Sequence, residues 1–292
     1  MQNVETIEWH ARGVNRAIDY INAHLAESLA LDTLAALGGF SPCHFHRVFK
    51  AIVGETHQKH ICRLRLERAV LLMDDGRSLT EIALAVGFSS PARFAEAFKA
   101  QYGVTPRAYR SRGAASIRKK PIVARAAAGD TDPSERKRIP FEIREFPGYR
   151  VAYARHIGGY DFTIGFAWKK LMGWARGKGY LSTDSLRISQ SWDDPELTDD
   201  GKLRYDACVT VPDGAEAEGA IGIRTIPGGT FAVFRYDGPQ SGLSDFYDRI
   251  YRTLLESPKM RLADDQGFRV HQETVPEQIM GFYKNELRIP LA

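Results

Sequence analysis

The chain has 292 residues, a formal net charge of +4 and 43% hydrophobic residues. No run of about 18 apolar residues occurs, which excludes a transmembrane helix, and the first residues lack the apolar segment of a signal peptide. The three cysteines, Cys43, Cys62 and Cys208, are scattered, which favours a reducing compartment over a disulfide framework. We therefore expect a cytoplasmic protein, not associated with a membrane, that is long enough for two domains.

In chain order, the first predicted helix runs from about Arg12 to Ala26. A helical pair follows in residues 31–56, a long helix is predicted over Thr56–Met73, and a second pair lies in residues 79–106. A short last helix reaches Arg112. At about 1.5 Å per residue, the long helix spans roughly 25 Å, which suits a rod between two DNA-reading elements.

The stretch 79–106 has the capping and turn residues of a helix-turn-helix. Ser78 and Glu81 have the spacing of a capping box, Gly87 suits a left-handed turn, and Pro91 suits the first turn of a second helix. The apolar stripe of that second helix comprises Phe94, Ala97, Phe98 and Tyr102. Its opposite, outer face carries Ala92, Arg93, Glu96 and Lys99.

Residues 31–56 repeat this pattern with a one-residue offset. The matched pairs include Gly39 with Gly87, Pro42 with Pro91, Phe45 with Phe94, Phe49 with Phe98, Lys50 with Lys99, and Gly54 with Gly103. The outward residues of the first repeat are Cys43, His46, Arg47 and Lys50. Two copies in register favour tandem helix-turn-helix units over an ordinary four-helix core.

Residues 11–112 resemble the DNA-binding domain of the AraC/XylS family of transcription regulators. The run GFSSPARFAEAFKAQYGVTPRAYR, residues 87–110, carries the most specific part of the match. The resemblance implies seven helices, binding to double-stranded DNA through both second helices, and RNA polymerase as a partner. We expect Arg47 and Arg93 to read bases, with His46 and Glu96 as weaker candidates, and Lys50 and Lys99 to contact phosphates.

Cys43, His44 and His46 invite comparison with a metal site. Their spacing matches no known ligand set, and no second cluster in the sequence completes four ligands. We therefore predict no metal and no cofactor. His46 is expected to face DNA.

Residues 113–139 are small, basic and interrupted by proline, which predicts a linker between domains 1–112 and 140–292. Lys and Arg outnumber Asp and Glu before residue 140, and the reverse holds after it. The last part predicts short strands with helices over 162–177 and 243–256. Two similar strand, Gly-turn, helix, strand units, beginning at RVAYARHIGGY and TFAVFRYDGPQ, predict a pseudo-symmetric α+β domain with a ligand cleft.

Residues 140–291 resemble the GyrI-like effector-binding family, also called the SHS2 type, through VAYARHIGGY, SWDDPEL, LRYDACV, GIRTIPGGTFAVFRYDGP and ELRIPL. The resemblance implies a cleft for bulky, often cationic or aromatic molecules, lined by aromatic side chains and one central carboxylate. The candidate ligand-binding residues are Tyr153, Trp168, Trp192, Phe234, Arg269, Glu273, Tyr283 and Glu286.

The sequence departs from that family at its central acid, where Arg269 aligns. An unpaired Arg269 in the cleft would favour anions. If Glu273 or Glu286 supplies the acid, the cleft is nearly neutral and binding rests on stacking. A third alternative places Arg269 on the solvent face.

The predicted function is a sequence-specific DNA-binding transcription regulator, not an enzyme, whose second domain binds an aromatic or amphipathic small molecule. One alternative is a hydrolase that uses Glu286, Tyr153 and Trp192 on a bound electrophile, fused to a DNA-binding domain. The other is a constitutive DNA-binding protein whose second half binds only protein.

Overall fold

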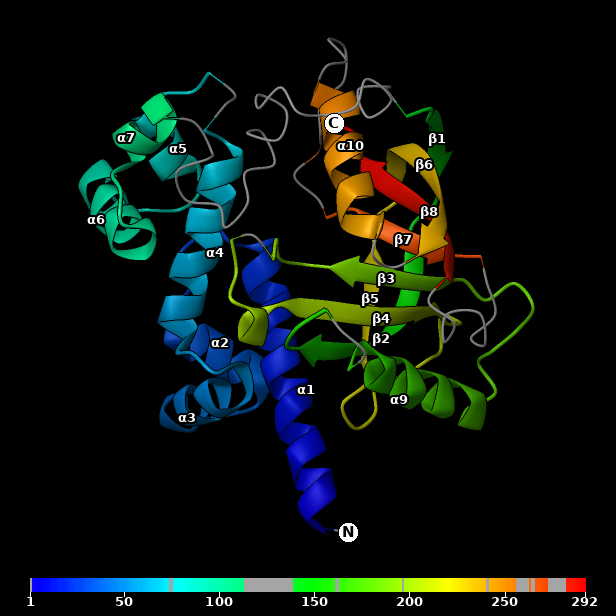
Figure 1. The fold of residues 1–292 in the computed structure, drawn as a ribbon. Helices are drawn as coiled ribbons and strands as arrows, with labels where there is room; N and C mark the ends of the chain where they lie inside the picture. Colours follow the sequence, from blue (N-terminus) through cyan, green and yellow to red (C-terminus); the bar gives the residue numbers. More distant parts are fainter. Residues whose placement is uncertain are drawn as a thin grey trace. The chain divides into compact units, whose positions relative to one another are not determined.

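The computed structural model describes residues 2–73, 76–112, 139–160, 163–195, 197–239, 242–255, 263, 266–272 and 282–292. The chain forms two compact units (Figure 1). A helical unit comprises Met1–Asp130 and Pro195–Lys202, and a sheet unit comprises Thr131–Asp194 and Leu203–Ala292. Within the predicted linker, residues 113–138 lie outside the described residues. The division assigns Pro195–Lys202, in the second predicted domain, to the helical unit.

Seven helices lie in the described part of the helical unit. They are α1 (Gln2–Ala23), α2 (Leu31–Gly38), α3 (Pro42–Val53), α4 (His57–Leu71), α5 (Leu79–Ala85), α6 (Pro91–Tyr102) and α7 (Pro106–Arg112). The start predicted for α1, near Arg12, is wrong. Trp9 and His10 pack on Phe40, with ring centroids 4.9 and 5.7 Å away, and these contacts support the earlier turns.

The predicted turns form as the residue types require. Gly39 and Gly87 end the first helix of each pair with φ of 78° and 92°, and Gly54 and Gly103 follow the second helices with φ of 81° and 74°. These left-handed conformations favour glycine because it lacks a Cβ. The capping box between Ser78 and Glu81 is also present.

The long helix α4 contacts both helical pairs. The Phe49 ring of α3 lies 5.4 Å from the ring of His60. Toward the other pair, Leu66 and Val70 pack in one cluster with Phe94 and Phe98 of α6. Thr56 begins the helix by accepting a hydrogen bond from the Lys59 amide. The apolar faces of α3 and α6, the second helix of each pair, thus both pack against the single helix α4.

The sheet unit contains one eight-stranded sheet in its described residues. The strands are β1 (Glu142–Phe146), β2 (Tyr149–Ile157), β3 (Arg187–Ser191), β4 (Arg204–Thr210), β5 (Gly222–Ile226), β6 (Gly229–Pro239), β7 (Phe268–His271) and β8 (Phe282–Pro290). Their order is β1-β6-β8-β7-β3-β4-β2-β5, and the paired strands are antiparallel. This α+β architecture confirms the predicted fold class.

The two halves of the sheet repeat one arrangement and meet at the β3–β7 pair. In one half α9 (Ile164–Gly177) connects β2 to β3, and in the other α10 (Leu243–Leu255) connects β6 to β7. The register places Ser189, Arg269 and Leu287 in one row across the sheet. Residues opposite each other in antiparallel strands share a face.

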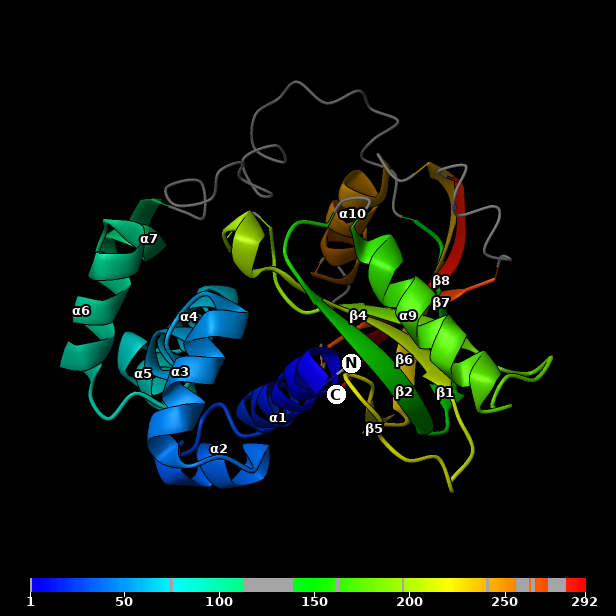
Figure 2. The same ribbon diagram turned by 90° about the horizontal axis from the view of Figure 1, so that it is seen from below.

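Both helices cover the same face of the sheet (Figure 2). Ala207, beside Ser189 in the register, packs under α9, and Leu287 packs under α10. We call this the helix-covered face. The opposite face buries residues of both halves, including Val151 and Phe268, in another cluster. Gly148 and Gly228, in the turns after β1 and β5 at the two sheet edges, approach closely, so the sheet curls over this second face, which we call the concave face.

The Gly87 turn allows a direct stability test with a matched control. A Cβ at Gly87 would lie 2.8 Å from the Ala26 carbonyl oxygen, whereas a Cβ at Gly103 would meet nothing within 4 Å. Both substitutions to alanine incur the left-handed strain of about 1–2 kcal/mol. Because only Gly87→Ala adds a backbone clash, we expect it to lower the melting temperature, followed by circular dichroism, more than Gly103→Ala. Equal losses would contradict this role of Gly87.

Candidate functional site

The outer face of α3 presents polar side chains opposite its buried aromatic pair. Cys43, Arg47 and Lys50 are exposed, and Phe45 and Phe49 are fully buried. The N-terminus of the helix follows Ser41 and contains Pro42 in its first turn. A short helix with one face in a core and the other basic and accessible has the geometry of a major-groove reader.

The second repeat reproduces this arrangement on α6. Phe94 and Phe98 are buried, and Ser90 caps the helix by accepting a hydrogen bond from the Arg93 amide. The predicted outer residues of α6 are exposed: Ala92, Arg93, Glu96 and Lys99. The two faces differ in chemistry, because Pro91 and Ala92 leave the start of α6 with few hydrogen-bonding groups.

The histidines of α3 pack against other rings of the helical unit. His46 is half-buried and its ring lies 5.5 Å from that of His57, edge to face. His44 lies with its Nε2 3.1 Å from Nε2 of His10. Burial and the nearby His46 lower the pKa of His57. Among the described residues no group of three or more His, Cys, Asp or Glu is arranged to hold a metal ion.

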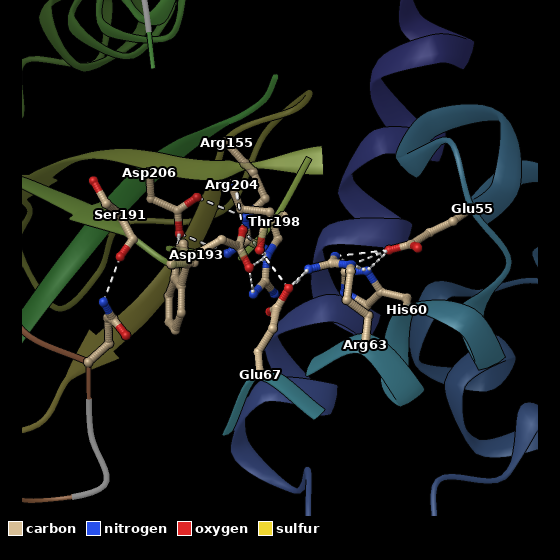
Figure 3. Close-up of polar contacts among 12 residues, drawn as sticks. Glu55, His60, Arg63, Glu67, Arg155, Ser191, Asp193, Thr198, Arg204 and Asp206 are labelled. Carbon is tan, nitrogen blue, oxygen red and sulfur yellow. Dashed lines mark hydrogen bonds and ion pairs between the residues drawn. The ribbon is translucent and has the colours of Figure 1, made fainter. Parts of the chain in front are cut away.

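A buried charged cluster joins the end of the first repeat to α4 (Figure 3). Glu55 accepts hydrogen bonds from His60 at 2.9 Å and from Arg63 at 2.9 and 3.0 Å, and Arg63 also pairs with Glu67 at 3.0 Å. Burial raises the pKa of Glu55, but hydrogen bonding to His60 and the charge of Arg63 outweigh it and lower the pKa to about 2. The Thr198 hydroxyl donates to Glu67 at 2.6 Å. Sequence reasoning missed this cluster.

A hollow of about 540 Å³ lies beside the start of α5, lined by Ser78, Leu79, Arg107, Arg110 and Ser111. The Nε and Nη2 atoms of Arg110 are buried and have no hydrogen-bond partner among the described residues. Sequence reasoning missed this hollow, because Arg107 and Arg110 lie on a short helix, α7, outside both repeats. This hollow lies on the helical unit, apart from the outer faces of α3 and α6.

Several predicted ligand residues lie on the concave face of the sheet. The Asp206 carboxylate there accepts from Arg155 through two 2.8 Å hydrogen bonds (Figure 3). It also accepts from Arg224 at 2.7 Å and from Trp192 Nε1 at 2.8 Å. Arg224 also stacks over Tyr153, 4.7 Å from the ring centroid. Burial raises the pKa of Asp206, but the two guanidiniums outweigh it and lower the pKa to about 2. Tyr153 and Trp192 thus belong to a closed ionic network.

Glu286 is occupied on the concave face as well. Its carboxylate pairs with Arg288 at 2.8 Å and with Arg144 at 3.3 Å. Glu286 stands opposite Val270 in the register, so it lies on the other side of the sheet from Arg269 and does not pair with it. Glu273 lies outside the described residues. The alternative in which Glu286 neutralises Arg269 is therefore wrong.

The residues of the hydrolase alternative lie on the concave face and take part in ionic and cation–π contacts there. Three strands, β7, β3 and β4, separate Glu286 on β8 from Tyr153 on β2. The curl of the sheet nevertheless brings β8 and β2 together across the concave face, where Arg288, the partner of Glu286, donates to the Tyr149 hydroxyl of β2 at 2.8 Å. Each side chain is already held by neighbouring arginines.

Arg269 lies on the helix-covered face, opposite Ser189 in the register. The alternative that places it on a solvent face is therefore wrong. Its Nε is buried without a hydrogen-bond partner, and none of the described carboxylates forms an ion pair with it. Burial would lower the pKa of Arg269, but the nearby Tyr247, Tyr205 and Tyr283 raise it. The guanidinium therefore stays charged, with phenol groups as its neighbours.

Asn285 lies beside Arg269 on this face and was not singled out by the sequence. Its side chain is 2% exposed, and both Nδ2 and Oδ1 lack hydrogen-bond partners among the described residues. Leaving such buried groups unsatisfied costs about 1–3 kcal/mol each. Because both ends of the amide are unpaired, exchanging its oxygen and nitrogen would not satisfy it. Such groups need a hydrogen-bond partner, which an ordered water or a ligand can supply.

A hydrogen-bonded chain borders Arg269 from the α9 side. Trp168 Nε1 donates to the Tyr205 hydroxyl at 2.9 Å, and His271 Nε2 lies 2.9 Å from the Ser189 hydroxyl. The Trp168 and His271 rings meet edge to face at 5.2 Å. Burial and the charge of Arg269 lower the pKa of His271 to about 3, so this imidazole is neutral.

The structure thus separates the predicted ligand set into two groups. Trp168, Arg269 and Tyr283 share the helix-covered face, whereas Tyr153 and Glu286 share the concave face. Phe234 also lies on the helix-covered side, but it is fully buried under α10 as part of a core cluster.

Comparisons with known proteins agree with this two-part organisation. A GyrI-like small-molecule-binding domain matches residues 139–286, and a helix-turn-helix domain matches residues 34–112. None of the helices in the described part of the chain has the length and apolar character of a membrane-spanning segment.

Two relatives match over most of the chain, and a solved structure matches the helical part. The Right origin-binding protein of Escherichia coli strain K12 is 28% identical over 264 residues, which cover 85% of each chain. The transcriptional regulator Rob of Salmonella typhimurium is 25% identical over 260 residues, again 85% of each. A solved transcriptional regulator with an AraC-type DNA-binding domain, from Chromobacterium violaceum, is 33% identical with a TM-score of 0.32, covering 34% of this chain and 90% of that one.

Replacing Asp206 should destabilise the sheet unit. Asp206→Asn leaves Arg155 and Arg224 without their carboxylate, and breaking a buried pair costs about 3–5 kcal/mol. We expect a lower midpoint of urea unfolding at pH 7, followed by tryptophan fluorescence. Asp213→Asn, which removes an exposed carboxylate of the same unit, should leave the midpoint unchanged.

The same carboxylate gives the effect a pH dependence. The folded-state pKa of Asp206, about 2, lies below its ordinary value of 3.8. Its stabilisation is therefore present above about pH 4 and is lost as the pH falls toward 2. The difference in midpoint between the native chain and Asp206→Asn should shrink over this range, and a constant difference would contradict the assignment.

Proposed function

Since the chain belongs to the AraC-type helix-turn-helix transcription regulators that carry a GyrI-like small-molecule-binding domain, we propose that α3 and α6 read DNA and that the helix-covered face of the sheet binds the effector. The observation that supports the DNA-binding part is the matched pair of exposed polar faces on α3 and α6. Each faces away from its own buried pair of phenylalanines. The chain is a DNA-binding transcription regulator, and the proposal concerns which residues act.

Within this proposal, Arg47 and Arg93 read base edges in the major groove. Arginine pairs with guanine through two hydrogen bonds, which contribute about 1–3 kcal/mol of discrimination. Lys50 and Lys99, one helical turn further along, contact phosphates as flexible point charges. Cys43, His46, Ala92 and Glu96 complete the two outer faces. Because Ala92 offers no hydrogen bond, α3 carries more of the base recognition than α6.

Arg47→Ala tests the base-reading role. A preferred duplex is first selected from random DNA with the native chain. We expect Arg47→Ala to reduce the ratio of specific to non-specific affinity about 5- to 150-fold, from the loss of one bidentate contact. Arg176→Ala, which removes an exposed arginine from α9, should leave the ratio unchanged. Equal weakening of every duplex by Arg47→Ala would instead make Arg47 a phosphate contact.

Lys50→Ala and Lys99→Ala test the phosphate role by a different readout. Each phosphate contact contributes about 0.9 to the slope of log affinity against log salt concentration. We expect either substitution to lower that slope by about one unit and to weaken preferred and random duplexes alike. Lys169→Ala on α9 supplies the control of equal charge. A change in sequence preference without a change in slope would contradict the assignment.

For the effector, the supporting observation is the set of unsatisfied polar atoms at Arg269 and Asn285 beside aromatic side chains. Trp168 and Tyr283 supply rings on this face, and Tyr247 lies close by on α10. Effector sites combine apolar and aromatic walls with a few convergent polar groups. The proposal places the ligand here and not on the concave face, whose charged groups are already paired.

The proposal further takes the protein to be a regulator without catalytic activity that works in the cytoplasm. Relatives that match over most of the chain include a transcriptional regulator. A regulator bound at a promoter acts on RNA polymerase, either by contact or by occlusion, and we include that enzyme as a partner.

A further inference from the structure

The charge of the effector follows from the groups that face Arg269. The family resemblance implies a central carboxylate and a cationic ligand, whereas this chain has a guanidinium at the corresponding position. Two acids of the sheet, Asp206 and Glu286, lie within a few register positions of Arg269. Both lie on the concave face, and both are paired with arginines. Among the described residues no carboxylate forms an ion pair with Arg269, and the acid near α10, Asp194, lies by Tyr251. A cation placed there would meet an uncompensated positive charge.

We propose that the helix-covered face binds an aromatic carboxylate, with Arg269 and Asn285 holding the carboxylate group and Trp168, Tyr247 and Tyr283 surrounding the ring. This inference rests on the effector site proposed above and adds the chemical class of its ligand.

The register brings the two polar side chains within reach of one small anion. Arg269 stands opposite Leu287 on β8, and Asn285 is two residues before Leu287 on the same face. Such diagonal neighbours are about 7–8 Å apart, a distance that long side chains span. Arg269 can donate from its guanidinium fork, and Asn285 can donate from Nδ2. A carboxylate between them accepts from both and satisfies the two unpaired donors, Arg269 Nε and Asn285 Nδ2.

The surrounding tyrosines also favour an anion, because their hydroxyl groups can donate hydrogen bonds to it. Burial raises the pKa of Tyr247 and of Tyr205, although Arg269 lowers each in part. Both phenols are therefore protonated at neutral pH. A phenol hydroxyl donates a hydrogen bond to a carboxylate and offers a cation only its oxygen lone pairs or ring face. His271 is neutral and its Nε2 is occupied by Ser189, so it neither competes for the anion nor repels it.

Three probes of one shape test the charge class on the full chain: 2-naphthoate, 2-naphthamide and 2-naphthylmethylammonium. They share a ring system and differ in charge. We expect calorimetric titration at constant ionic strength to give about ten- to hundredfold tighter binding for naphthoate than for the other two, as charged hydrogen bonds require. Arg269→Gln should abolish this preference, and Arg269→Glu should shift it toward the ammonium probe. Arg235→Gln, an exposed arginine on the concave side of β6, should retain it.

Asn285→Leu separates loss of the site from loss of folding. The substitution replaces an unsatisfied buried amide by an apolar side chain of similar volume, so the melting temperature should rise or stay constant. Naphthoate affinity should fall nevertheless, because one donor to the carboxylate is gone. A lower affinity in a variant that is at least as stable as the native chain supports a direct contact.

Two results would overturn the inference in different ways. Tighter binding of the ammonium probe, or naphthoate binding that is unchanged in Arg269→Gln, would refute the anionic class. The effector site itself would stand in that case if Trp168→Leu still weakened binding. If no probe binds at millimolar concentration, or if neither Trp168→Leu nor Asn285→Leu affects binding, both the charge class and the proposed effector site are wrong.

Discussion

The alternation of side chains along β7 and β8 is the constraint on which the electrostatics of the sheet unit depends. Successive residues of a strand point to opposite faces. Arg269 and Glu286 are therefore separated by the sheet itself, since Arg269 stands opposite Leu287 and Glu286 stands opposite Val270. A register shift of one residue would bring the two charges to the same face and neutralise them. The hydrophobic clusters on both faces hold the register, because Leu287 and Val270 are both buried.

The helical unit was largely predictable because its decisive signals are local. Ser78, Glu81 and Gly87 act within one turn of the residues that they cap or end, so their roles can be read from spacing. The start of α1 was not predicted, because its first turns are stabilised by a contact that is distant in sequence. Trp9 packs on Phe40, beyond the connection between α1 and α2. The Glu55 cluster escaped for a similar reason. A glutamate before a helix normally lies in water, and only the tertiary structure shows that Arg63 and His60 bury it.

The strands of the sheet unit were also predictable, but the faces of its polar residues were not. Short alternating runs identify a strand without saying which side meets a helix. Asp206 receives Arg155 from 51 positions earlier in the chain, and Asn285 reads in sequence as an ordinary surface amide. The aromatic residues predicted to line one cleft were divided for this reason. Tyr153 and Trp168 both fit a ligand wall by composition, yet they lie on opposite faces.

This division explains how the central position of the fold can carry an arginine without unfolding the sheet. The acids that stabilise the unit, Asp206 and Glu286, are neutralised on the concave face by arginines of the same strand or of nearby strands. Arg269 takes no part in these pairs. Its charge therefore acts on whatever occupies the helix-covered face, where the pKa of His271 is depressed and the phenols remain neutral. In the proposed site, the charges that stabilise the sheet are separate from the charge of Arg269 that would select the ligand, so a substitution of Arg269 would change the ligand class while the supporting ion pairs stay intact.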